Sequence, residues 1–250
     1  IKMKKLILYL SIVLLTVLAV SDQGFAVTYK QVSLNFAQNT NQAFAGGQLI
    51  GPLATDSRYW NTTIDRHSGT LAAGVLGGLI DVSGAPTGIT VEWASPNTWY
   101  NGDGTGSDDA KLAVGYLDDG TPPTVTMTGI PYATYDAYIL ITSDLNGDYN
   151  HGVITVNGTG VVGGVNFPAH GRVTDGTGWV ECDGTVNGYY VKVTGLTSDT
   201  LTIVSTRDGD ARAPLTGVVI VSDEIAPSPQ RSVSTNFQWS QNDPSGWGYH

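Results

Sequence analysis

Apolar and polar residues alternate one by one along most of this chain, and no other feature constrains its fold as strongly. In the stretch QVSLNFA, for example, Val32, Leu34 and Phe36 share one face. Because successive side chains of an extended backbone point to opposite faces, this alternation predicts half-buried β-strands. We expect about ten of them, over residues 31–37, 88–94, 110–117, 124–129, 136–142, 152–158, 177–182, 187–196, 199–206 and 215–223.

Turn signals separate these stretches. The chain has 32 glycines, with five Asp-Gly and four Asn-Gly pairs, the dipeptides that tolerate the positive φ of tight hairpin turns. Beyond the first 26 residues, no segment sustains a helical repeat of apolar residues. The sequence therefore predicts an all-β, antiparallel β-sandwich of the jelly-roll type, formed by residues 27–224 as one domain.

The first 26 residues have the layout of a secretory signal peptide. Met3-Lys4-Lys5 is a basic start, residues 6–20 are an apolar run, and Gly24-Phe25-Ala26 ends in a small residue. The run is short for a membrane span, although a retained N-terminal anchor is the alternative. We expect a secreted or cell-surface protein with no membrane span once residues 1–26 are removed.

Charge excludes one class of partner. Removal of residues 1–26 leaves nine Lys and Arg against 21 Asp and Glu, a formal net charge of −12. Such a chain repels phosphate backbones, so nucleic acid is not an expected partner.

No catalytic constellation stands out. The lone cysteine, Cys182, has no nearby cationic partner in the sequence, which favours a buried thiol over a nucleophile. Glu92 alternates with Val91 and Trp93 and should face solvent, whereas glycoside hydrolysis needs two facing carboxylates. The histidines have no metal-ligand spacing. We therefore expect a protein that is not an enzyme.

The stretch NGDGTGSDD, residues 101–109, is rich in oxygen ligands. Calcium takes six to eight oxygens, often from alternate loop positions. The bidentate acid that closes an EF-hand is missing, because the twelfth position is Leu112. Asp and Asn are also ordinary turn residues, so a plain turn is the alternative. The candidate ligands of a calcium ion, which is the one cofactor that the sequence leaves open, are Asn101, Asp103, Asp108 and Asp109.

Two aromatic residues directly precede this loop. Trp99 and Tyr100 could stack on the faces of sugar rings if they are exposed on a loop. The alternative is that their rings pack in the core or at its rim.

Four stretches resemble a known family. VSLNFAQN, KLAVGYLDDG, VTMTGIPYATYDAYILITSD and LTGVVIV are similar to parts of secreted bacterial jelly-roll modules, which are galactose-binding-like β-sandwiches. The resemblance covers roughly residues 31–222. It implies the fold and a bias toward sugar binding or surface structure.

Residues 225–250 look like a linker followed by a spare strand. Pro227 and Pro229 stiffen the linker, which cannot join a sheet interior. Beyond it, apolar and polar residues alternate again, and a strand of this kind must bury its apolar face. That face consists of Val233, Thr235, Phe237 and Trp239.

Two functions follow as hypotheses. The first is a non-enzymatic structural subunit that inserts residues 231–240 into a neighbouring copy and so builds an extracellular or cell-surface filament, with itself as its partner. If the tail instead folds back on its own domain, no filament forms. The second is a carbohydrate-binding jelly roll, with glycans as partners and calcium as a possible requirement.

Overall fold

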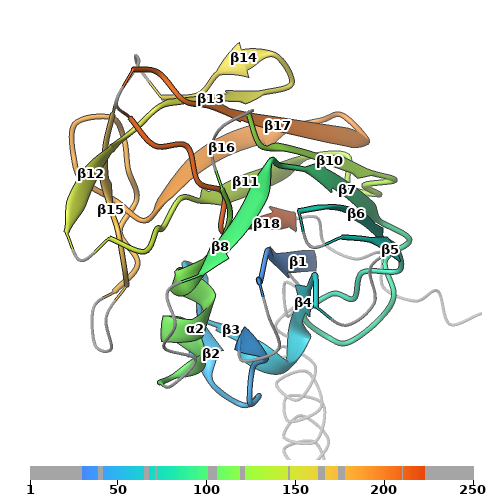
Figure 1. Cartoon of the computed structure of the whole chain (residues 1–250). Helices are drawn as coiled ribbons and strands as arrows, with labels where there is room; N and C mark the ends of the chain where they lie inside the picture. The colour runs from blue at the N-terminus through green and yellow to red at the C-terminus, as the bar shows by residue number, and fades with distance from the viewer. Residues whose placement is uncertain are drawn as a thin grey trace, which may run out of the picture.

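The chain folds into two facing β-sheets, as a computed structural model shows (Figure 1). The structure describes residues 30–222 except 39–41, 65–67, 71, 101–105, 119–121, 146, 163–166, 174–177 and 210. The predicted signal peptide and the tail lie outside these residues. The fold class is all-β, as the alternation predicts.

The first sheet has five strands in the order β16-β11-β18-β1-β4. Its first and last long strands in the sequence, β1 and β18, pair at its centre with Val32 opposite Ile220. Neighbours are antiparallel except β1 and β4, which run parallel. The strands are β1 (Lys30–Asn35), β4 (Trp60–Thr62), β11 (Tyr135–Leu140), β16 (Tyr190–Leu196) and β18 (Gly217–Ser222).

The second sheet has seven antiparallel strands in the order β14-β13-β17-β10-β7-β6-β5. The alternation of β17 is visible in its burial, because Leu201, Ile203 and Ser205 are buried between half-buried neighbours. The strands are β5 (Ser68–Gly69), β6 (Ala73–Leu76), β7 (Thr90–Ala94), β10 (Thr124–Thr128), β13 (Val153–Val156), β14 (Thr159–Gly160) and β17 (Thr200–Thr206).

The main core fills the space between the two sheets. Inward residues of the first sheet, such as Leu34 and Ile139, belong to the same buried cluster as Trp93 and Leu201 of the second. Cys182 lies in this cluster as well, and its burial raises the pKa of the thiol. The expected burial of Cys182 is thus confirmed.

A covering layer lies on the outer face of the five-stranded sheet. It comprises β2 (Leu49–Ile50), β3 (Thr55–Asp56), the 3₁₀-helix η2 (Ser57–Tyr59) and the helix α2 (Asp108–Val114). With this layer the outer face forms a second apolar cluster, whose buried members are Ile50, Trp60, Leu112, Tyr138, Leu140 and Val219.

The helix α2 corrects one prediction. The alternation predicts a strand over residues 110–117, but the chain is helical up to Val114 and extended only in β9 (Gly115–Asp118). Ser107 is the N-cap, since its hydroxyl accepts a hydrogen bond from the Ala110 N–H at 3.2 Å. Asp108 and Asp109 then lie in the first turn, where the helix dipole favours carboxylates.

The strand count also differs from the prediction. The two sheets hold twelve strands and the described residues hold eighteen, where the sequence predicts about ten. Of the strand predicted over residues 177–182, the described part, 178–182, makes only a bridge from Glu181 to Tyr190. The remaining strands form two small ladders, β8 (Asn97–Tyr100) with β9, and β12 (Asp148–His151) with β15 (Phe167–His170). Among the described residues, no helix has the length and apolarity needed to span a membrane.

Candidate binding site

The covering layer leaves one row of the five-stranded sheet open. Register places Asp136 of β11, Val221 of β18 and Gln31 of β1 side by side across three strands. The next row, with Tyr138 and Val219, is already covered, and Leu53 at the turn between β2 and β3 packs against it. Strand register therefore determines which residues form the floor of the site. The edge of the covering layer, at Leu53, forms its wall.

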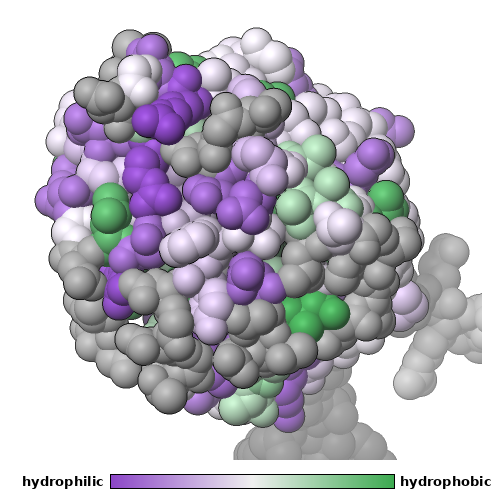
Figure 2. All heavy atoms as spheres, in the orientation of Figure 1, coloured by the Kyte–Doolittle hydropathy of each residue, from purple (hydrophilic) through white to green (hydrophobic). Residues whose placement is uncertain are grey.

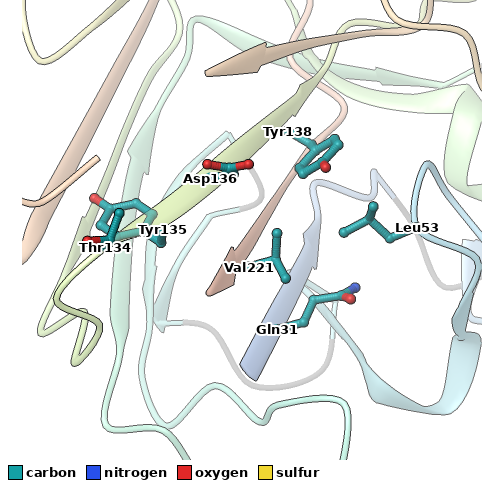
Figure 3. Close-up of a pocket in the computed structure, with 7 residues that line it drawn as sticks. All are labelled: Gln31, Leu53, Thr134, Tyr135, Asp136, Tyr138 and Val221. Atoms are coloured by element: carbon teal, nitrogen blue, oxygen red, sulfur yellow. The ribbon is translucent and has the colours of Figure 1, made fainter. Parts of the chain in front are cut away.

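A hollow of about 430 Å³ lies over this open row. Figure 3 shows Tyr138 and Leu53 close together at one end and Thr134 and Tyr135 at the other. Asp136 and Val221 lie between them, and Gln31 lies below Val221 and Leu53 in this view. The Tyr135 ring itself belongs to the main core, so this residue lines the hollow from its base.

The charged group of the hollow is Asp136, which is held by two donors. Its carboxylate forms an ion pair with the Lys192 Nζ at 3.2 Å and accepts a hydrogen bond from the Gly195 N–H at 3.0 Å. This carboxylate raises the pKa of Lys192 above its usual value. The Lys192 ammonium also lies 5.3 Å from the centre of the Tyr138 ring. The pair fixes the carboxylate in place while both groups stay partly exposed.

Gln31 presents an oriented acceptor. Its Nε2 donates to the Ser33 hydroxyl at 2.9 Å and to the Thr55 hydroxyl of the covering layer. Within the described part of the chain no donor contacts its Oε1. That oxygen is thus positioned to accept a hydrogen bond from a ligand.

A second hollow of about 380 Å³ continues the first. Both are lined by Gln31 and Leu53, so the two hollows adjoin each other at this pair. Asp56 and Tyr59, at the edge of the cover, line the second hollow. Asp56 forms an ion pair with the Arg58 guanidinium, which lies 5.7 Å from the centre of the Tyr59 ring. Its other lining residues are Ala54, Thr55 and Val82. The two adjoining hollows are together named here the outer groove.

The outer groove suits binding better than acid–base chemistry. Its two carboxylates, Asp136 and Asp56, are each ion-paired. Hydrogen bonds from Arg58 lower the pKa of Asp56, which is the opposite of what a general acid needs. Oriented acceptors beside tyrosine and leucine side chains instead match a site that recognises hydroxyl groups and apolar ring faces.

The structure does not bring Trp99 and Tyr100 onto one surface. They are neighbours in β8, so their side chains point to opposite faces of the ladder. Trp99 is exposed at 48%, whereas Tyr100 is half-buried. Neither lines the outer groove. Only Trp99 is presented to solvent as the stacking prediction requires.

A polar cluster lies beneath the ladder face that carries Trp99. The cross-strand partner of Trp99 is Tyr116, which is fully buried. The Tyr116 hydroxyl donates to Asp144 at 2.8 Å, and the Arg212 guanidinium donates to both. Asp118 lies 3.6 Å from the same guanidinium. Figure 2 shows hydrophilic residues and separate hydrophobic patches on the face of the molecule on which β8 lies in Figure 1.

The structure gives Asp108 and Asp109 structural partners. Asp108 accepts hydrogen bonds from the Ala45 N–H at 2.8 Å, the Gly46 N–H at 3.0 Å and the Ser57 hydroxyl at 2.7 Å. Asp109 accepts from the Gly51 N–H and the Trp179 indole N–H, each at 2.8 Å. These carboxylates attach α2 to the rest of the cover.

The other predicted positions have mixed outcomes. Glu92 is exposed, as expected. Among the described residues, no group of three His, Cys, Asp or Glu side chains could hold a metal ion. The remaining calcium candidates and the tail strand lie outside the described residues, and their roles stay predictions. These positions are Asn101, Asp103, Val233, Thr235, Phe237 and Trp239.

Sequence reasoning missed the outer groove. Asp136 could have been noticed, because it is a carboxylate beside the buried run AYILI. Gln31 and Leu53 carry no such signal, since only the pairing of β1 with β18 and the end of the cover bring them to Asp136.

Comparisons with known proteins are distant. No family matches the chain, and none of the curated proteins does. The ANX2 ectodomain from Arabidopsis thaliana aligns over 77% of this chain and 49% of its own length, at 14% identity and a TM-score of 0.36. A calcium-binding mutant of Bacteroides uniformis beta-glucuronidase 2 aligns over 76% of this chain and 18% of its own, at 14% identity and a TM-score of 0.30.

An isomalto-dextranase from Arthrobacter globiformis T6, complexed with panose, aligns over 78% of this chain and 32% of its own length, at 11% identity and a TM-score of 0.27. This chain therefore spans less than half the length of each similar structure. Scores this low do not establish a shared fold, so the function has to be argued from the chain's own residues.

Proposed function

We propose that this chain is a carbohydrate-binding β-sandwich module that holds a glycan in the outer groove. The observation that carries the proposal is that two hollows adjoin each other and share Gln31 and Leu53. A groove of two consecutive hollows fits a chain of sugar units better than a single unit.

The chemistry of the groove supports the same ligand class. The Asp136 carboxylate and the Gln31 carbonyl oxygen accept hydrogen bonds from hydroxyl groups. Tyr138, Leu53 and Val221 offer apolar surface to the C–H faces of a sugar ring. Lys192 balances the charge of Asp136, so this part of the groove does not require a charged ligand.

Glycan-array screening of the secreted chain, followed by calorimetry with the best ligand, tests this function. Asp136→Asn should weaken binding at least tenfold, or about 1.4 kcal/mol, because a charged acceptor and its ion pair are lost. Asp183→Asn, in an exposed turn outside the groove, is the matched control. Equal affinity of the Asp136 variant and the wild type would reject the outer groove as the site.

Two finer features belong to this proposal. Trp99 is a separate stacking surface, so Trp99→Ala should leave the affinity of the outer groove unchanged. Calcium dependence would have to come from the 101–109 stretch, and removal of calcium with a chelator should not change binding in the groove. Both measurements use the same calorimetric assay.

A filament subunit is the second candidate function. One observation favours it, namely that β16 is a seven-residue strand at the edge of its sheet and pairs with β11 alone among the strands of the structure. An edge of this length is a template for another chain. Electron microscopy of secreted protein should show polymers, and deletion of residues 227–250 should abolish them. If the protein has only monomer mass at high concentration, this function is rejected. A filament subunit would be located outside the cell or at the cell surface.

A further inference from the structure

The open edge of β16 borders a hollow between the two sheets. From Val191 to Leu196 the strand pairs only with β11 in the part of the chain that the structure describes. Across from it, the hairpin β13–β14 forms the edge of the other sheet. The sandwich is therefore unsealed along this side.

The hollow here measures about 470 Å³ and has an apolar floor. Val193 and Leu196 come from β16, and Val156 and Val161 come from β13 and from the residue after β14. Val161, Val193 and Leu196 are only half-buried, although they pack against the main core. The core thus reaches the surface at this place, named here the edge groove. Its polar lining residues are Asn157, Thr159, Lys192 and Thr194.

The edge groove has little of the usual protection against strand addition. Natural sheets shield edges with short strands, prolines, β-bulges or charges that point along the edge. The other terminal strands, β4, β5 and β14, have two or three residues. β16 has seven and contains no proline, and its one register shift against β11 lies between Val193 and Leu196. Its one charge, Lys192, faces the outer side and is paired with Asp136.

We propose that the edge groove is the acceptor for residues 231–240 of a second copy of this chain. The inference rests on the filament function above and identifies the surface that it needs. From Val233 to Trp239 the apolar face of the donor is about 20 Å long in extended form, and the open edge from Val191 to Leu196 is about 17 Å long. Phe237 and its apolar neighbours complete the core over Val193 and Leu196.

The connection to the domain favours a second copy over the same chain. Register places Ser222 at the end of the sheet where Leu196 lies, two strand spacings or about 10 Å from β16. To pair antiparallel with β16 of its own domain, the chain would have to reverse within residues 223–230. From the sequence, prolines at 227 and 229 predict an extended stretch of about 12 Å over residues 226–229. A short stiff connection of this kind promotes exchange between copies.

Complementary variants of the full chain test the acceptor. Val193→Asp blocks the groove and leaves the tail intact, whereas Phe237→Asp blocks the tail and leaves the groove intact. Each alone should remain monomeric by light scattering, and an equimolar mixture should form dimers and nothing larger. Val186→Asp, at an exposed site outside the groove, and Ser234→Asp, on the polar face of the tail, should still polymerise.

Should Val193→Asp fail to fold by circular dichroism, Leu196→Lys replaces it at the end of the groove. Disulfide trapping gives an independent readout, with Val193→Cys combined in turn with cysteine at 233, 235, 237 or 239. Cys182 is buried and does not interfere. The expected result is a ladder of cross-linked multimers on a non-reducing gel.

The other outcomes overturn the proposal in different ways. Cross-links confined to monomers show that the tail closes its own groove. Polymers that persist in the Val193→Asp variant show a filament with another acceptor. Absence of polymers in the wild type removes the filament function itself.

Discussion

Asp108 is a fully buried carboxylate with four hydrogen-bond donors. Besides Ala45, Gly46 and Ser57, the Lys111 ammonium lies 3.3 Å from Oδ1. Burial by itself would raise the pKa of this carboxyl group, but the hydrogen bonds outweigh it and the pKa is lowered. Asp108, which the sequence offers as a metal ligand, therefore connects α2 to the rest of the covering layer through hydrogen bonds.

We predict that Asp108→Ala destabilises the protein by about 3 kcal/mol, because it leaves buried donors without an acceptor. Urea unfolding at neutral pH measures the change. Asp183→Ala, which removes an exposed turn carboxylate, should cost less than about 1 kcal/mol. The same difference in calcium and in chelator is expected, and a difference that appears only in calcium would restore the metal hypothesis.

The lowered pKa also predicts a pH dependence. Because the folded-state pKa lies below the unfolded value of about 3.9, the ionised carboxylate contributes stability above that pH. The contribution is lost as the pH falls toward the folded-state value. The unfolding free energy of Asp108→Asn should therefore fall less steeply than that of the wild type below about pH 4. Parallel curves for the two proteins would contradict the assignment.

The conformation of the covering layer depends on one glycine, Gly51. Gly51 has φ +75°, and a Cβ added to it would lie 2.6 Å from Cζ2 of Trp60. The turn at Gly51 therefore needs both the left-handed backbone and the missing side chain. This turn leads into Leu53, which lines the outer groove.

We predict that Gly51→Ala costs more stability than Gly47→Ala. Gly47 has a similar φ of +79°, but nothing lies within 4 Å of an added Cβ. Backbone strain of about 1–2 kcal/mol applies to both, whereas displacement of Trp60 applies only to Gly51. Hydrogen exchange should show faster opening of residues 44–57 in Gly51→Ala. Equal losses of unfolding free energy for the two substitutions would show that the Trp60 ring moves aside without a measurable loss of stability.

The strands were predictable from the sequence because their signal is local. Alternation in β7 and β17 directly reports which side chains are buried. In β1 and β11 the covering layer buries residues of both faces, which alternation alone does not predict. The helix α2 was missed because its seven residues span two turns, too few for a helical period to show. The capping pattern of Ser107 followed by two aspartates was the available sign.

At the scale of the whole molecule, the two sheets share one core and should unfold together. We predict that Ile139→Ala in the five-stranded sheet and Leu201→Ala in the seven-stranded sheet each cost about 2–5 kcal/mol, since both side chains are fully buried. Calorimetry should show one transition that shifts as a whole in either variant. Two separate transitions would mean that the sheets are independent units.

The outer groove could not be predicted, because it is a property of the assembled sheet. Gln31, Leu53 and Asp136 come from three distant parts of the chain, and strand order alone makes them neighbours. The alternation within a strand says which face a residue occupies but not which strand lies beside it. The sandwich was therefore predictable and its binding surface was not.

The central pairing of β1 with β18 also sets the time at which the protein can fold. These strands are separated by nearly the whole domain in sequence, so the five-stranded sheet cannot close until residue 222 is available. A contact of such long range costs loop-closure entropy and slows folding. If residues 1–26 direct export, as the sequence predicts, this delay would be useful. The polypeptide would stay unfolded while it crossed the membrane, and the fold would form once its last strand had followed.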